Sequence, residues 1–164
     1  MKAKEITLSA ALIALTIVIL YLNLLLPIST ISILTLASLL IPIALIRGSI
    51  KSAILVYSGS SIIGFFLLPI NIILLYILFF GIYGIIKFYI EKINKLPLEI
   101  IIKVIFFNII FFISFFIFNS FISIEITKLP IGLFIVVAQI VFLVFDYALT
   151  LLISFYLERI HSKL

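Results

Sequence analysis

Residues 104–118 read VIFFNIIFFISFFIF, a run in which only Asn108 and Ser114 are polar. The run lacks the alternation of apolar and polar residues that marks a membrane β-strand. It continues into further apolar residues on both sides, so that it reaches the roughly 20 residues with which a helix crosses the hydrocarbon core. A helix also satisfies its backbone hydrogen bonds internally, as lipid requires. The stretch therefore predicts a transmembrane helix.

The composition extends this conclusion to the whole chain of 164 residues, of which 66% are hydrophobic and 10% are charged. A soluble domain carries roughly 25% charged residues. The chain has no Cys, which excludes disulfides and thiol chemistry. Its net charge of +5 could suggest nucleic acid as a partner, but the basic residues fall at the ends of the apolar runs. We therefore interpret the charge as a signal of membrane topology.

Proline, glycine and charged residues divide the chain into six apolar segments. We expect spans at residues 6–26, 31–46, 50–68, 70–86, 98–122 and 131–157. Pro42 is expected to interrupt the second span. The first apolar run is longer than the hydrophobic region of a signal peptide, which predicts a retained span. The predicted fold is an all-α polytopic membrane protein with a single transmembrane domain over residues 1–164.

The positions of Lys and Arg predict the orientation of these spans. If both termini are cytoplasmic, ten basic residues fall on the cytoplasmic side and one, Lys128, on the external side. The ten are Lys2, Lys4, Arg47, Lys51, Lys87, Lys92, Lys95, Lys103, Arg159 and Lys163. This bias obeys the positive-inside rule. We expect a multi-pass protein of the cell membrane with both ends inside.

Few residues suit catalysis or metal binding. The single histidine, His161, lies in the C-terminal tail, and no G-x-x-x-x-G-K-[ST] phosphate-binding loop occurs. Gly59-Ser60-Ser61 has no nearby base in the sequence. We expect no enzyme activity, cofactor, metal or nucleic-acid partner, and we expect the small residues of the third span to pack helices closely.

Polar residues inside the later spans are candidates for function. Asp146 falls well inside the last span, where an ionisable group costs a few kcal/mol and normally faces a partner. Gln139 and Thr150 share its helical face, and Asn108 and Asn119 share one face of the preceding span. Antiparallel packing would bring Asn108 near the level of Asp146. The set either fixes helix register by hydrogen bonds or contacts a ligand.

Two residues of the fourth span complete the candidate binding set, Asn71 and Tyr76. Tyr76 is an alternative to Asn108 as a hydrogen-bond partner for a protonated Asp146. An ionised Asp146 is equally compatible with the sequence.

Two further charge patterns lie at span ends. Lys103 follows Glu99 by four residues, an order that favours an ion pair within one helix. Lys87, Glu91 and Lys95 also repeat every four residues. They predict a polar helical extension of the fourth span, either solvated or docked to a partner.

Two short motifs carry a resemblance to a known family. Residues 8–14 read LSAALIA, in which Ala10 and Ala14 form a small-xxx-small pair. Residues 43–53 read IALIRGSIKSA, with a basic-glycine turn after a short span. With six short spans, the chain resembles the substrate-binding S components of energy-coupling factor (ECF) transporters.

The resemblance implies a function and a set of partners. It implies that the chain binds a vitamin or other micronutrient near the external side. It also implies that Ala10 and Ala14 dock against a transmembrane T component, although internal packing is an alternative for this pair. Separate ATPase subunits would supply the energy. A membrane scaffold of cell-wall synthesis, or a multi-pass protein of unrelated role, remains the alternative interpretation.

Overall fold

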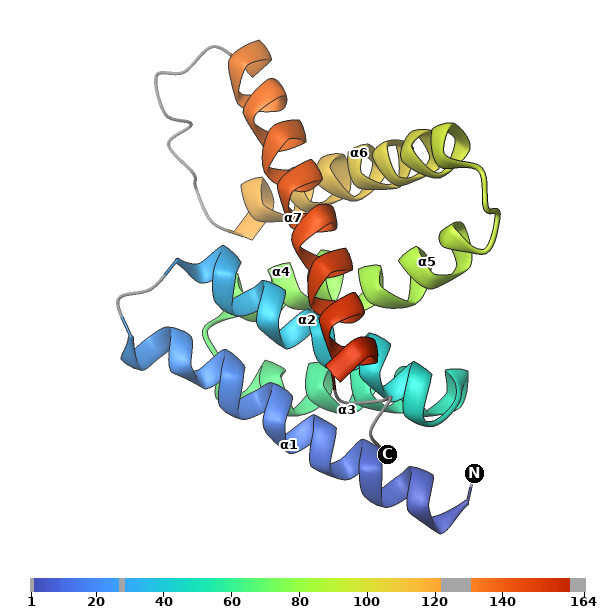
Figure 1. Cartoon of the computed structure of the whole chain (residues 1–164). Helices are drawn as coiled ribbons and strands as arrows, with labels where there is room; N and C mark the ends of the chain where they lie inside the picture. The colour runs from blue at the N-terminus through green and yellow to red at the C-terminus, as the bar shows by residue number, and fades with distance from the viewer. Residues whose placement is uncertain (1, 27–28, 122–130, 160–164) are drawn as a thin grey trace. The chain divides into compact units, whose positions relative to one another are not determined.

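The computed structural model describes the backbone of residues 2–26, 29–121 and 131–159, and the side chains of 2–26, 29–117 and 132–158. These residues are almost entirely helical and contain no strand. The elements in chain order are α1 (Ala3–Leu25), α2 (Thr30–Arg47), α3 (Ile50–Leu67), α4 (Ile70–Leu75), η1 (Tyr76–Phe80), α5 (Gly81–Glu91), α6 (Leu96–Phe121) and α7 (Ile131–Arg159) (Figure 1). Because α4, η1 and α5 are continuous, six helices are long and apolar enough to cross a membrane. The prediction of six helical spans is confirmed.

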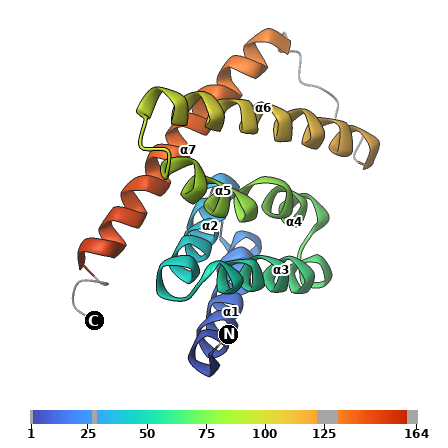
Figure 2. The same cartoon turned by 90° about the vertical axis from the view of Figure 1, so that its right-hand side faces the viewer.

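The helices form two compact units, Met1–Ile93 and Asn94–Leu164. In the first unit, α1, α2, α3 and the continuous α4–η1–α5 helix run in alternating directions (Figures 1 and 2). Helix α2 contacts α1, α3, η1 and α5. Its side chains Leu34, Ala37 and Ile41 are completely buried, so that α2 forms the centre of this unit.

Pro42 does not interrupt α2, contrary to the sequence-based expectation, because the helix continues from Thr30 to Arg47. Pro42 offers no N–H to the carbonyl oxygen of Ser38, and neighbouring helices in a membrane make such a site tolerable. Gly84 of α5 packs directly on this site. A Cβ atom added at Gly84 would lie 2.7 Å from Cδ of Pro42. The proline therefore sits inside the contact between α2 and α5.

Glycines also permit the close approach of α3 to α1. A Cβ atom added at Gly59 would lie 2.6 Å from Cδ1 of Ile13. The expected packing role of the small residues in this span is borne out at this position. The neighbouring Ser60 is fully buried, and its Oγ donates to the carbonyl oxygen of Val56 at 2.6 Å.

Residues Tyr76–Phe80 form a π-helical turn where the sequence predicts an ordinary helix. The N–H of Gly81 donates to the carbonyl oxygen of Tyr76, five residues earlier. The Tyr57 hydroxyl donates to the carbonyl oxygen of Ile77 at 2.9 Å. Tyr57 thus links α3 to this wide turn, a side-chain contact that helical periodicity does not reveal.

The polar extension of the fourth span is shorter than the sequence predicts. Helix α5 ends at Glu91, and Asn94 adopts a left-handed backbone with φ of 54°. Lys95 therefore lies outside α5, and its backbone N–H instead donates to Oε1 of Glu99 at 3.1 Å, at the start of α6. Within α5, Lys87 and Glu91 form an ion pair one helical turn apart, with an Nζ–Oε1 distance of 2.7 Å.

The second unit consists of α6 and α7, which cross at a steep angle (Figures 1 and 2). The rings of Phe107 and Phe142 stack with centroids 4.5 Å apart and planes 11° from parallel. Phe111 and Phe134 make a second, tilted ring contact at 5.7 Å. These aromatic contacts place residues 107–111 of α6 against residues 134–142 of α7.

Candidate functional site

An ion pair joins α6 to α7 beside the stacked phenylalanines. Nζ of Lys103 donates to Oδ2 of Asp146 at 3.1 Å. Their side chains are 8% and 19% exposed, respectively. A charged group inside a membrane span is costly unless it faces a partner, and breaking a buried pair leaves the remaining charge uncompensated. The pair is therefore a strong constraint on how α6 and α7 meet.

A pair of amides forms a second polar link between the same helices. Nε2 of Gln139 donates to Oδ1 of Asn108 at 2.8 Å. Nδ2 of Asn108 donates to the carbonyl oxygen of Val104 at 2.8 Å, so that both ends of this amide are hydrogen-bonded. We call Lys103, Asp146, Asn108 and Gln139 the α6–α7 polar cluster.

The cluster brings together three of the predicted site residues, but in a different register. Asn108 pairs with Gln139, whereas the sequence places it near the level of Asp146. The contacts still follow an antiparallel order, from Lys103–Asp146 to Phe111–Phe134, but they are shifted along the helices from the register estimated from the span ends. Thr150 shares the face as predicted, but its hydroxyl donates to the backbone carbonyl oxygen of Asp146 at 2.9 Å.

Lys103 is the residue that sequence reasoning missed as a partner of Asp146. The order Glu99–Lys103 directs attention to a pair within α6. The signal that could have found it is the opposite charge of Asp146 and Lys103, which both fall within the last two predicted spans. Such charges in neighbouring membrane helices usually pair with each other.

The remaining predicted binding residues lie elsewhere. Tyr76 belongs to the first unit, where it is completely buried and its hydroxyl lies 2.8 Å from Oγ of Ser60. Asn71 is exposed in the first turn of α4. The side chain of Asn119 lies outside the described residues. Tyr76 bonds Ser60 within the first unit, and Asp146 bonds Lys103 within the second.

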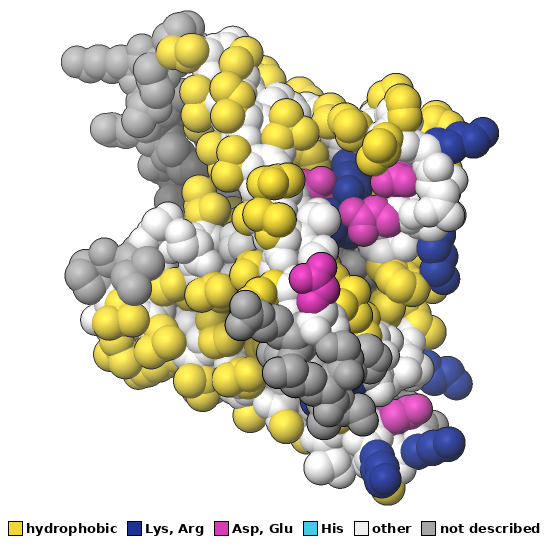
Figure 3. Space-filling view, viewed as in Figure 1, with side chains coloured by type: hydrophobic (Ala, Val, Ile, Leu, Met, Phe, Trp, Pro, Cys, Tyr) yellow, Lys and Arg dark blue, Asp and Glu magenta, His cyan; other side chains and the backbone are white. Residues whose placement is uncertain are grey.

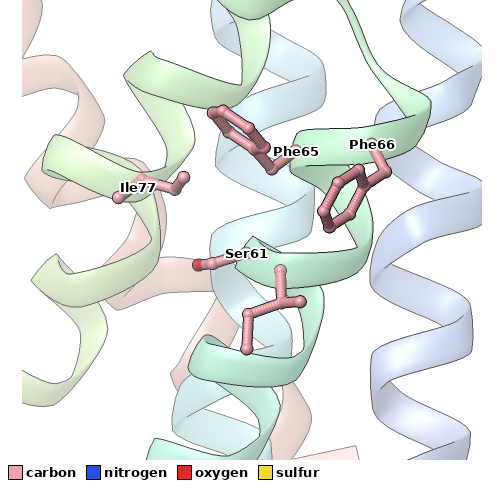
Figure 4. Close-up of a pocket in the computed structure, with 5 residues that line it drawn as sticks. Ser61, Phe65, Phe66 and Ile77 are labelled. Atoms are coloured by element: carbon pink, nitrogen blue, oxygen red, sulfur yellow. The ribbon is translucent and has the colours of Figure 1, made fainter.

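A small apolar hollow lies between α3 and η1 in the first unit. Ser61, Ile62, Phe65, Phe66 and Ile77 line it, and its volume is about 240 Å³ (Figure 4). Ser61 is 9% exposed, and its Oγ has no hydrogen-bond partner among the described residues. Pockets that hold drug-sized ligands usually measure about 300–1,000 Å³ and offer several polar groups. The hollow does not fit a polar vitamin.

Ala10 and Ala14 are exposed on α1. The buried side of the same helix carries Ser9, Leu12, Thr16 and Leu20. At about 100° per residue, the two alanines lie on the other side of the helix from this buried row. Within residues 1–93, the pair therefore lies outside the buried row through which α1 packs.

No cluster of three or more His, Asp or Glu residues suitable for a metal ion occurs in the described ranges 2–26, 29–121 and 131–159. Comparison of the chain with protein-family models, curated proteins and solved structures found no match in any of the three. The fold itself defines the class, a multi-pass helical membrane protein.

Proposed function

We propose that the chain is the substrate-binding subunit of an ECF-type uptake transporter for a vitamin or other micronutrient, energised by separate ATPase subunits. The observation that carries the proposal is the exposure of Ala10 and Ala14 on α1. Small side chains allow another membrane helix to approach closely, because packing replaces hydrophobic burial as the driving force inside lipid. The partner in this proposal is a transmembrane T component, which would seat a helix on the alanine face.

The α6–α7 polar cluster is the proposed ligand-binding region, which places the site deeper in the membrane than the external position that the resemblance implies. It concentrates an ammonium, a carboxylate and two amides, which together can recognise a polar molecule. A ligand at this position would exchange hydrogen bonds with groups that now bond each other. The positive-inside bias supports an orientation with both termini cytoplasmic.

Co-purification tests the docking step. The tagged full-length chain is co-expressed with the T-component and ATPase genes of the same organism and purified in mild detergent. We expect the complex with wild-type protein and its loss in Ala10→Trp/Ala14→Trp, because two indoles block close helix approach. The matched control is Leu15→Trp, at a position of α1 that is 46% exposed and about 100–140° around the helix from the pair.

The outcomes separate docking from folding. Loss of the complex only in the alanine variant, with unchanged helicity by circular dichroism, supports the proposal. A complex that survives both indoles contradicts the docking assignment. Recovery of cell-wall synthesis proteins in place of a T component favours the scaffold alternative.

Labelling tests the orientation. Single cysteines are introduced at Lys92 and Lys128, in a chain that has no native Cys. We expect a membrane-impermeant maleimide applied to intact cells to label only the position 128 variant. Labelling of the position 92 variant from outside contradicts the proposed topology.

A further inference from the structure

The ionised residues of the first unit all belong to one end of it. They are Lys2, Lys4, Glu5, Arg47, Lys51, Lys87, Glu91 and Lys92, and residues 6–46 and 52–86 contain none. These positions fall at the start of α1, the end of α2, the start of α3 and the end of α5. Because the helices alternate in direction, these four helix ends lie together, and the opposite end has no ionised side chain.

Cations dominate the exposed surface of this end. Its five exposed cations are Lys2, Lys4, Arg47, Lys51 and Lys92. The carboxylate of Glu91 pairs with Lys87, and that of Glu5 accepts a hydrogen bond from the backbone N–H of Lys2 at 3.2 Å. Figure 3 shows Lys and Arg side chains gathered on the right-hand side, where these helix ends lie. We call the five residues the basic end.

Exposed apolar side chains lie one helical turn from two of these cations. Ile54, which is 51% exposed, follows Lys51 by three residues, and Phe88, which is 36% exposed, precedes Lys92 by four. Nζ of Lys92 lies 4.4 Å from the ring centroid of Phe88 and 5.3 Å from that of Tyr89. Lysine and aromatic rings in this arrangement are typical of the boundary between headgroups and hydrocarbon.

We propose that the basic end binds the headgroups of anionic phospholipids, with Lys51 and Lys92 as its principal contacts. An anionic lipid offers a phosphate and an acyl chain next to each other. This arrangement matches a cation at the helix end with an exposed Ile54 or Phe88 one turn further into the helix. A soluble acidic protein or a nucleic acid supplies the negative charge but no chain to cover these apolar residues. The inference does not depend on the transport proposal, since it concerns another surface.

Lipid titration of the purified full-length chain in a neutral detergent tests the inference. Dioleoyl phosphatidylglycerol and dioleoyl phosphatidylcholine, which share their acyl chains, are added separately. Bound lipids are counted by native mass spectrometry, and the melting temperature is followed by circular dichroism. We expect tighter binding and a larger rise in melting temperature with the anionic lipid. This preference should disappear at about 1 M salt, where the Debye length falls to about 3 Å.

Charge variants locate the binding surface. One cation near a membrane surface contributes about a fivefold change in affinity, so Lys51→Gln/Lys92→Gln should bind phosphatidylglycerol about 25-fold more weakly than wild type. Lys51→Arg/Lys92→Arg, which keeps the charge, should retain wild-type binding. Lys128→Gln, outside residues 1–93, is the control for a change in net charge and should also bind as wild type.

Three results would overturn the inference. The first is equal affinity for the two lipids in low salt. The second is an undiminished preference in Lys51→Gln/Lys92→Gln. The third is binding of soluble polyglutamate as tight as that of phosphatidylglycerol, which would assign the basic end to an acidic protein.

Discussion

The two units of the chain differ in how far polar side chains join their helices, although Tyr57 and Tyr76 make two such links in the first unit. In residues 1–93, the buried hydroxyls of Ser9, Thr16 and Ser38 donate to carbonyl oxygens of their own helices at 2.7–2.8 Å. In residues 94–164, the polar side chains of Lys103 and Gln139 instead bond side chains of the facing helix. In the first arrangement, each polar side chain finds its hydrogen-bond partner within its own helix. In the second, it finds that partner only when the neighbouring helix is in place.

This difference shows two ways of joining helices in lipid. The first unit joins helices by shape, through glycines at Gly59 and Gly84 that admit Ile13 and Pro42. The second has two helices, and only 6% of the most apolar part of α6 and 17% of that of α7 is buried. With so little buried surface, charge and hydrogen bonding have a larger share in holding α6 against α7.

The largest effect is expected from breaking the ion pair. Lys103→Leu alone leaves the carboxylate of Asp146 without its counter-charge, and Asp146→Leu leaves the ammonium of Lys103, so each should destabilise by about 3–5 kcal/mol. The double variant Lys103→Leu/Asp146→Leu should lose much less than the sum. Unfolding in SDS titrations, followed by circular dichroism, gives the double-mutant cycle.

Asp146→Asn sharpens the test, because it keeps the shape but removes the charge. We expect it to destabilise the protein when Lys103 is present and to have little effect in a Lys103→Leu background. Additive losses in either cycle would contradict a coupled pair.

An intermediate effect is expected from the glycines of the first unit. In Gly84→Ala the new methyl group meets the ring of Pro42, which cannot rotate away, so we expect a loss of about 1–3 kcal/mol. In Gly59→Ala the methyl group meets Cδ1 at the flexible end of Ile13, and the loss should stay below about 1 kcal/mol. The same SDS titration compares the two. Equal losses would show that rigid shape at Pro42 is not what joins α2 to α5.

The smallest effect is expected at the amide link. Hydrogen bonds between membrane helices contribute about 0.6 kcal/mol on average, with a maximum near 1.7 kcal/mol. Gln139→Leu should therefore lower stability by about this amount, and by less when Asn108 is also replaced by Leu. A loss as large as that of Lys103→Leu would mean that the amides, and not the charges, hold α6 to α7.

The sequence by itself determined the class of the protein and the number of its spans. Long apolar runs such as 104–118 can satisfy their backbone only as helices in lipid, and breaks at Pro69, Pro97 and the Arg47-Gly48 turn separate them. These signals are local, so neighbouring helices are not needed to read them. The exclusive placement of charges at one end of residues 1–93 is likewise visible in the sequence.

The tertiary structure decided which residues meet. Periodicity assigned Asp146 and Gln139 to one face of α7. It did not reveal that these two residues pair with Lys103 and Asn108 of α6. It could not show that Pro42 stays within a continuous helix, because Gly84 of a distant segment packs against it. Nor could it tell that the buried row of α1 runs along the other side of the helix from Ala10 and Ala14. Each of these outcomes depends on a partner far away in sequence, and a helical period carries no information about that partner.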